Sequence, residues 1–286
     1  MNQIPTIAFV CEQANQLPCA PWVLPRLIAT LEDSNATTKD VEQLIAMDPG
    51  LASTTLRMAN SVFVSMAGQR CDSLDQAVLR LGFKGLYRMA ATAAATRWLN
   101  QDIKGYGWQK GDLARHSLCV AIAAETLADE MGGHLPFKKE VAYAAGLLHD
   151  IGKLALAHAY PDLFEQIRQM QKTVYWRQAE HEILGYDHTD IGGALLKNWD
   201  FPEKFIQVAR FYSRPQMSEA ANRALVTHIH AAKHLAILIG LGVGEEGFQT
   251  ELDEEALKQA GYSSETMEHL LPSILHEAKK VLSDIH

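Results

Sequence analysis

The stretch GLLHDIGK, residues 146–153, places a histidine, an aspartate and a lysine within five positions of an otherwise apolar helical segment. On an α-helix, the adjacent residues His149 and Asp150 point about 100° apart, and Lys153 lies about one turn from both. A metal held by imidazole and carboxylate would have an ammonium group beside it for a substrate phosphate. Alternatively, His149 hydrogen-bonds a carbonyl group in the core while Asp150 pairs with Lys153 on the helix surface. The stretch alone leaves both interpretations open.

The sequence around this stretch indicates helices. Helix start and stop signals recur along the chain, and no run of alternating β-branched and polar residues is long enough to predict a sheet. One helix is expected from about Leu113 to Met131, and a second from about Lys138 through HDIGK to Ala159. Their histidines can meet only if these two helices pack side by side. The chain is therefore predicted to be all-α.

The N-terminal part carries the same kind of helix punctuation. Thr37–Asp40 and Ser73–Gln76 match the capping-box pattern, and Gly82 is expected to end the short helix that follows Ser73. The polar, glycine-rich residues 101–112 are typical of a connector between two helical parts. The chain is accordingly divided into an N-terminal helical part, a second helical part and a C-terminal helical extension, over residues 1–105, 106–242 and 243–286.

Composition excludes several classes of function. Asp and Glu outnumber Lys and Arg by 34 to 26 and neither terminus carries a basic block, so nucleic acid is not expected as a partner. The four cysteines show no CxxC spacing, and no apolar run is long enough to span a bilayer. We expect a cytoplasmic protein with reduced thiols and no membrane contact. A glycine-rich phosphate loop and a GxSxG motif are both missing from the sequence.

The segment AGLLHDIGKLAL resembles the HD superfamily of metal-dependent phosphohydrolases. From about Leu17 to Gly242 the chain is similar to the HDOD branch, the HD-related output domain. The resemblance is carried, in the order typical of the family, by LPRLIATLEDSNATTKDVEQLIAMDPGLASTTLRMANSVF, SLDQAVLRLGFKGLYRMA, EHEILGYDHTDIGGALLKNWDFPE and THIHAAKHLA. It implies an HD-like helical fold preceded by an N-terminal helical subdomain, in a bacterial signal-transduction protein.

The same resemblance implies a set of metal-site residues. His116 in LARHSLCVA matches the first histidine of the superfamily, and His149-Asp150 match its central pair. Lys153 matches the accompanying lysine, which would contact phosphate. His188 in DHTDIG matches a histidine that the two-metal relatives use. An occupied site would hold a divalent transition metal such as iron, manganese or zinc.

Two departures from the family pattern weaken this site. The paired histidines of the relatives correspond here to Phe211 and Tyr212, and neither is expected to bind a metal. The closing aspartate corresponds to Lys233 in HAAKHLA, and a protonated lysine cannot ligate a metal. We hypothesise that the Lys233 ammonium group lies near the metal position and pairs with Asp150. On this hypothesis the site is degenerate and no cofactor is expected.

Two functions remain open at the level of sequence. The first is a regulatory HDOD module that binds a protein or a small-molecule signalling partner, with little or no catalysis. The second is a phosphohydrolase acting on a nucleotide or another phosphoester, with His116, His149 and Asp150 holding one ion. Glu180 is expected either to hydrogen-bond His188 or the neighbouring helix end, or to be solvated. The remaining motif-free histidines are expected to make ordinary packing or polar contacts: His158, His181, His228, His230 and His234.

Overall fold

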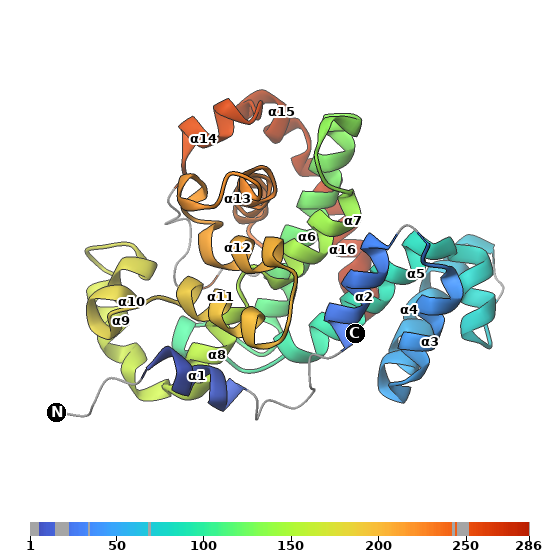
Figure 1. The fold of residues 1–286 in the computed structure, drawn as a ribbon, viewed down its shortest axis with the longest axis horizontal. Coiled ribbons are helices and arrows are strands. Elements are labelled where there is room, and N and C mark those ends of the chain that lie inside the picture. The colour runs from blue at the N-terminus through green and yellow to red at the C-terminus, as the bar shows by residue number, and fades with distance from the viewer. Residues whose placement is uncertain are drawn as a thin grey trace.

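The computed structural model describes residues 6–14, 23–33, 35–67, 70–241, 244 and 252–285. All regular elements among these residues are α-helices or short 3-10 helices, which confirms the predicted all-α class. The N-terminal helices α2–α5 form one layer, seen on the right of Figure 1. Their bounds are α2 Val23–Glu32, α3 Thr38–Ala46, α4 Pro49–Ala67 and α5 Leu74–Leu99.

The predicted punctuation of the N-terminal layer is present. The Thr37 amide donates to Asp40 Oδ2 at 2.7 Å, and Ser73 Oγ accepts from the Gln76 amide at 3.3 Å. Helix α5 continues past Gly82, but Gly82 itself has a φ of 66° and a ψ of −178°. The predicted helix end is therefore a kink within α5, at a φ that glycine adopts without a steric penalty.

The second part of the chain forms the larger body of the molecule. Helix α6 covers Asp112–Met131, close to its predicted bounds, and packs side by side with α7, Lys139–Leu148. The remaining helices of this body are α8 Ile151–Ala159, α9 Phe164–Met170, α10 Trp176–Leu184, α11 His188–Asn198, α12 Glu203–Phe211 and α13 Arg223–Ile239. Short 3-10 turns lie between them: η1 Lys104–Tyr106, η2 Gly132–His134, η3 Pro161–Leu163 and η4 Pro215–Met217.

The N-terminal helix and the C-terminal helices pack against different sides of this body. Helix α1, Ile7–Ala14, packs against α8 and α11, far from the N-terminal layer (Figure 1). The C-terminal helices are α14 Glu254–Gln259, α15 Ser264–His269 and α16 Leu271–Ile285. Helix α16 contacts both α6 and α4, so it joins the second part of the chain to the N-terminal layer.

The single helix predicted from Lys138 to Ala159 is wrong. Helix α7 ends at Leu148 and α8 begins at Ile151, because Asp150 leaves helical geometry with a φ of −103° and a ψ of 18°. The expected separation of about 100° between His149 and Asp150 therefore does not apply. The break lets both side chains reach the same interior space.

Close backbone packing positions this break. A Cβ atom added to Gly152 would lie 1.9 Å from the His188 carbonyl oxygen and 2.6 Å from the Gly192 amide nitrogen. We expect Gly152→Ala to lower the free energy of unfolding by at least about 2 kcal/mol, because α8 and α11 must separate. The matched control is Gly192→Ala on the facing helix, where an added Cβ would meet its nearest neighbour at 3.4 Å. Equal urea-unfolding midpoints for the two variants would contradict this packing.

A buried histidine ties the C-terminal helices to the core. His228 Nε2 donates to the Ala124 carbonyl at 2.8 Å, and Nδ1 lies 2.6 Å from the Tyr262 hydroxyl. Burial lowers the pKa of His228 from 6.5 to about 4. Between these values the unfolded chain binds more protons than the folded one.

Stability is therefore expected to fall as the pH drops from 6.5 toward 4, by about 1.4 kcal/mol per pH unit from this residue. Urea unfolding at several pH values would measure the slope. His228→Gln removes the titrating group. It should reduce the slope of the unfolding free energy against pH by the amount that corresponds to about one bound proton. An unchanged slope in this variant would show that His228 does not contribute.

Candidate functional site: a buried histidine–aspartate–lysine centre

The central side chains come from two helices, α6 and α8, and from the break between α7 and α8. His116 lies on α6, His149 and Asp150 lie at the junction of α7 and α8, and Lys153 lies one turn into α8. All four are buried, with exposed fractions of at most 1%. Gly146 permits this convergence, because a Cβ there would lie 2.7 Å from the Ala121 Cα on α6. The sequence prediction that the two histidine-bearing helices pack side by side is confirmed.

Three of the predicted ligands converge as a group that could hold a metal ion. One ligand atom from each of His116, His149 and Asp150 lies within 4.8 Å of the others. Asp150 Oδ2 is 3.3 Å from His149 Nε2 and 3.7 Å from His116 Nε2. His149 Nδ1 is 2.8 Å from the Gly146 carbonyl oxygen, so it carries the hydrogen in the neutral ring. His149 Nε2 then presents its lone pair toward the carboxylate, as in metal-binding histidines.

Both imidazoles are held in the neutral form. Burial, with His149 and the nearby lysines adding to it, lowers the pKa of His116 to about 3. Burial also lowers the pKa of His149. Neither ring nitrogen of His116, nor His149 Nε2, has a hydrogen-bond partner among the described residues. These nitrogens supply donor chemistry that suits a cation.

The surrounding charges act against a metal. The Nζ atoms of Lys153 and Lys233 lie 2.8 and 3.3 Å from the same oxygen, Asp150 Oδ2. Lys233 is thus in the position that the sequence hypothesis required. Burial alone would raise the pKa of Asp150, but its interactions with His149, Lys153 and Lys233 hold it well below its usual range. Asp150 is therefore an ionised carboxylate shared by two ammonium groups.

Tyr212 occupies the other side of the carboxylate. Its hydroxyl donates to Asp150 Oδ1 at 2.5 Å and accepts from Lys233 Nζ at 3.1 Å. The sequence predicted only that Tyr212 does not bind a metal. The signal that could have found it is the family resemblance, in which Phe211 and Tyr212 correspond to the paired histidines of the relatives.

His188 lies outside the His116–His149–Asp150 group. Its Nε2 is 3.9 Å from Asp150 Oδ1 and 2.9 Å from the Tyr212 hydroxyl. His188 Nδ1 and the His188 backbone amide donate to Glu180 Oε2 at 2.6 and 2.8 Å, so Glu180 bonds both His188 and the start of α11, as two of its expected alternatives stated. The Tyr212 hydroxyl therefore lies between His188 Nε2 and Asp150 Oδ1 and contacts both.

The connector between the two helical parts completes the wall around Lys153. Tyr106 and Trp108 are buried, and Lys153 Nζ lies 5.6 and 4.9 Å from their ring centroids. The Tyr106 hydroxyl also donates to Glu180 Oε1 at 2.5 Å. The sequence predicted only a connector here, because its two aromatic residues belong to no motif. The Lys153 side chain is fully buried among these groups, and its predicted phosphate contact stays a prediction.

The other histidines make local contacts. His230 Nδ1 donates to the Tyr212 carbonyl at 2.8 Å, and Nε2 accepts from the Asp253 amide at 3.0 Å, so His230 packs as expected. His181 forms a second group with Asp187 and Asp190. Asp187 there already accepts from the first amides of α11 and from Arg177, so its carboxylate serves as a helix cap.

The HDOD domain profile matches residues 17–215, which is more than half of the chain. The chain belongs to the HDOD domain family. An HDOD domain protein of unknown function from Geobacter sulfurreducens has a similar fold, with a TM-score of 0.75, 22% identity, and coverage of 98% of this chain and 99% of that one. A Shewanella amazonensis protein provisionally described as a phosphohydrolase has a TM-score of 0.69 and 22% identity, covering 98% of each chain. At these identities the likeness establishes the HDOD fold alone.

An uncharacterised protein from Treponema pallidum (strain Nichols) is 25% identical to this HDOD protein over 207 residues. The match covers 72% of this chain and only 39% of the Treponema protein, so the chain spans well under half of that relative's length. Among the described residues, no helix has both the length and the apolar character needed to cross a membrane.

Proposed function

We propose that this HDOD protein is a regulatory signalling module that has lost robust metal-dependent hydrolysis. Its HD centre, formed by His116, His149, Asp150, Lys153 and Lys233, is proposed to stabilise the fold. One observation carries the proposal, namely that Lys233 Nζ lies 3.3 Å from Asp150 Oδ2 where the superfamily carries a metal-binding carboxylate. With Lys153 on the same oxygen, the positive charge that a metal would supply is already provided by the chain.

Electrostatics gives the reason. At a separation of about 4 Å and an effective dielectric constant near 20, a dication and an ammonium group repel by about 8 kcal/mol. The attraction between the dication and Asp150 has about the same size. One carboxylate can therefore offset only one of the two ammonium groups, and the neutral imidazoles offset neither. The positions of His116 and His149 suit a metal ion, but the two ammonium groups leave too little net negative charge at the centre to bind a dication.

The phosphohydrolase remains the second proposal because a specific observation favours it. His149 Nε2 and both nitrogens of His116 lack hydrogen-bond partners among the described residues, which is what metal-binding nitrogens show when no metal is bound. The Shewanella relative, provisionally described as a phosphohydrolase, is consistent with this reading. Against it, Lys153 is fully buried and bonded to Asp150 rather than directed toward an incoming phosphate.

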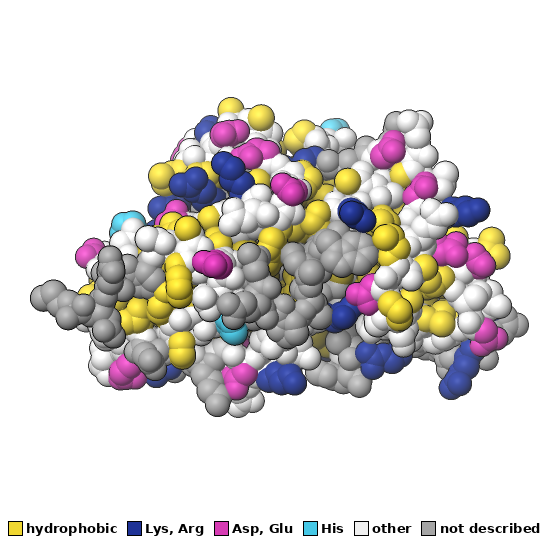
Figure 2. Space-filling view, turned by 60° about the horizontal axis from the view of Figure 1, so that its bottom comes forward, with side chains coloured by type: hydrophobic (Ala, Val, Ile, Leu, Met, Phe, Trp, Pro, Cys, Tyr) yellow, Lys and Arg dark blue, Asp and Glu magenta, His cyan; other side chains and the backbone are white. Residues whose placement is uncertain are grey.

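The partner of the module is proposed to be a protein or a small molecule rather than nucleic acid. The chain carries a formal net charge of −8. On the face shown in Figure 2, Lys and Arg side chains are interspersed with Asp and Glu rather than gathered into a basic surface. A phosphate backbone binds best to a continuous basic surface.

Elemental analysis and turnover assays on the full chain test the proposal. The assays use a nucleotide panel and a chromogenic phosphodiester with added manganese or iron, compared with His149→Ala. We expect well under one metal ion per chain and equal background rates for both proteins. Near-stoichiometric iron, manganese or zinc together with metal-dependent turnover that His149→Ala abolishes would overturn the proposal.

A further inference from the structure

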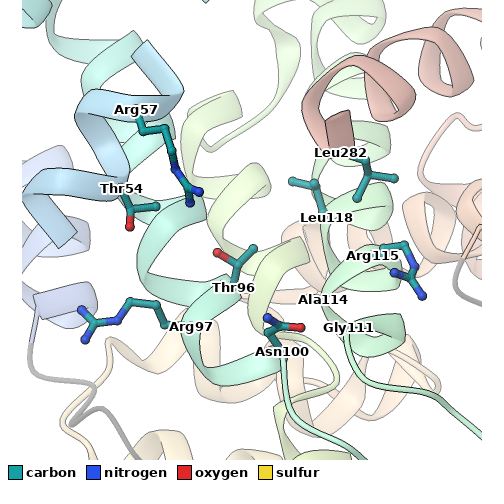
Figure 3. Close-up of a pocket in the computed structure, with 10 residues that line it drawn as sticks. All are labelled: Thr54, Arg57, Thr96, Arg97, Asn100, Gly111, Ala114, Arg115, Leu118 and Leu282. Atoms are coloured by element: carbon teal, nitrogen blue, oxygen red, sulfur yellow. The ribbon is translucent and has the colours of Figure 1, made fainter. Parts of the chain in front are cut away.

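A cavity of about 160 Å³ lies where α4, α5, α6 and α16 meet, away from the buried HD centre (Figure 3). Its walls therefore come from the N-terminal layer, the second helical part and the C-terminal helix. Three arginines line it, one from each of α4, α5 and α6: Arg57, Arg97 and Arg115. In Figure 3, Arg57 extends from α4 toward α5.

The lining of this cavity carries positive charge without any carboxylate. Asp48 and Asp112, outside the lining, pair with Arg97 and Arg115 and hold these guanidinium groups at the wall. Arg57 pairs with no carboxylate among the described residues, so one positive charge remains after both ion pairs are counted. In a protein of net charge −8 this is a local excess.

Other cavities of the molecule differ in this respect. The cavity beside Arg88 includes Glu277 in its lining, and the two cavities near α14 both include Glu254 and Glu255. An anion entering any of those would face a carboxylate. The arginine-lined cavity has no carboxylate in its lining, and guanidinium forms bidentate, charge-assisted hydrogen bonds with phosphate.

Polar and apolar walls in the cavity suggest how a ligand would lie. Thr54 and Asn100 add neutral hydrogen-bonding side chains near the arginines, and Ala114 at the start of α6 brings the positive end of the helix dipole. Leu118 and Leu282 form an apolar wall on the other side (Figure 3). We propose that this cavity binds a small phosphate-bearing molecule, with the phosphate on Arg57 and the organic part against the two leucines.

A ligand here would contact all three parts of the chain at once and so would favour one arrangement of them. This regulatory meaning rests on the signalling role proposed above, whereas the binding itself does not. Hydrolysis at the HD centre would overturn the signalling role and leave the phosphate site standing. Absence of phosphate binding would remove the site and leave the question of hydrolysis untouched.

Calorimetric titration of the full chain at constant ionic strength tests the site with inorganic phosphate, 5′-AMP, adenosine and citrate. We expect binding of phosphate and 5′-AMP at millimolar concentration or below, and no binding of adenosine. Arg57→Gln should weaken 5′-AMP binding by about tenfold or more, because a charge-assisted contact is lost. Arg70→Gln, at an exposed arginine outside the cavity, should leave the affinity unchanged.

A second variant keeps every charge and fills the space. Ala114→Leu should abolish 5′-AMP binding while circular dichroism stays that of the parent. Wild-type affinity in both Arg57→Gln and Ala114→Leu would place the ligand elsewhere and overturn the proposal. Equal affinity for adenosine and 5′-AMP, or citrate binding more tightly than phosphate, would also overturn the assignment of a phosphate ligand.

Discussion

Asp150→Asn is expected to lower the free energy of unfolding by about 3–5 kcal/mol, the usual effect of removing one partner from a buried ion pair. The substitution keeps the shape of the side chain and removes only its charge. In the parent, Oδ2 of this carboxylate lies within 3.3 Å of the Nζ atoms of Lys153 and Lys233. Without it, two buried ammonium groups face each other and the neutral imidazoles of the centre.

Urea unfolding at neutral pH measures this loss. Asp129→Asn is the matched control, because Asp129 forms a surface ion pair with Lys139 at 2.7 Å. Removing this pair should lower the free energy of unfolding by at most about 1 kcal/mol. Adding Lys153→Met to Asp150→Asn should recover part of the stability, because one of the two ammonium groups is then gone. A loss in Asp150→Asn no larger than that in the surface control would show that the centre is not held by charge pairing.

Lys233→Asp is expected to create tight binding of a divalent transition metal. The change removes one ammonium group from the carboxylate that it shares and adds an anionic ligand at the position where the superfamily carries one. Each of these changes is worth several kcal/mol for a dication, so affinity should rise on the order of a hundredfold or more. His116, His149 and Asp150 are already gathered within 4.8 Å to complete the site.

Cobalt titration with visible absorption gives a readout that does not depend on activity. Lys233→Met removes the same charge without adding a ligand, so it should improve affinity much less than Lys233→Asp. If the parent and Lys233→Asp bind cobalt equally well, the lysine is not what keeps the metal out. Loss of the new site in Lys233→Asp combined with His149→Ala would locate the metal at the HD centre.

Much of the fold was predictable because helix signals are local. The capping residues Thr37 and Ser73 and the glycine at 82 act on their own neighbours, and the structure contains the corresponding helix starts and kink. The break at Asp150 was not predictable from such signals, because GLLHDIGK contains no proline and its pattern is continuous with a helix. Packing of Gly152 against the His188 backbone, a contact between distant segments, accompanies the break.

The candidate site divides in the same way. Family resemblance placed His116, His149, Asp150 and Lys233 at one centre, and their contacts agree with that grouping. Tyr106 and Trp108 lie at the site because the connector passes beside Lys153. Tyr212 lies there because α12 ends beside Asp150. No local pattern distinguishes these aromatic residues from ordinary core residues.

By itself the sequence determined the all-α class, the HDOD membership and the presence of a cation where an anionic ligand was expected. The all-α class follows from helix signals along the chain, whereas the family and the unexpected cation follow from the resemblance to HDOD sequences. Only the tertiary structure decided which atoms meet, namely two ammonium groups and a tyrosine hydroxyl on one buried carboxylate, and an arginine-lined cavity among three parts of the chain. The physical reason is that charge interactions depend on distances between helices, and those distances are set by close packing at positions such as Gly146 and Gly152.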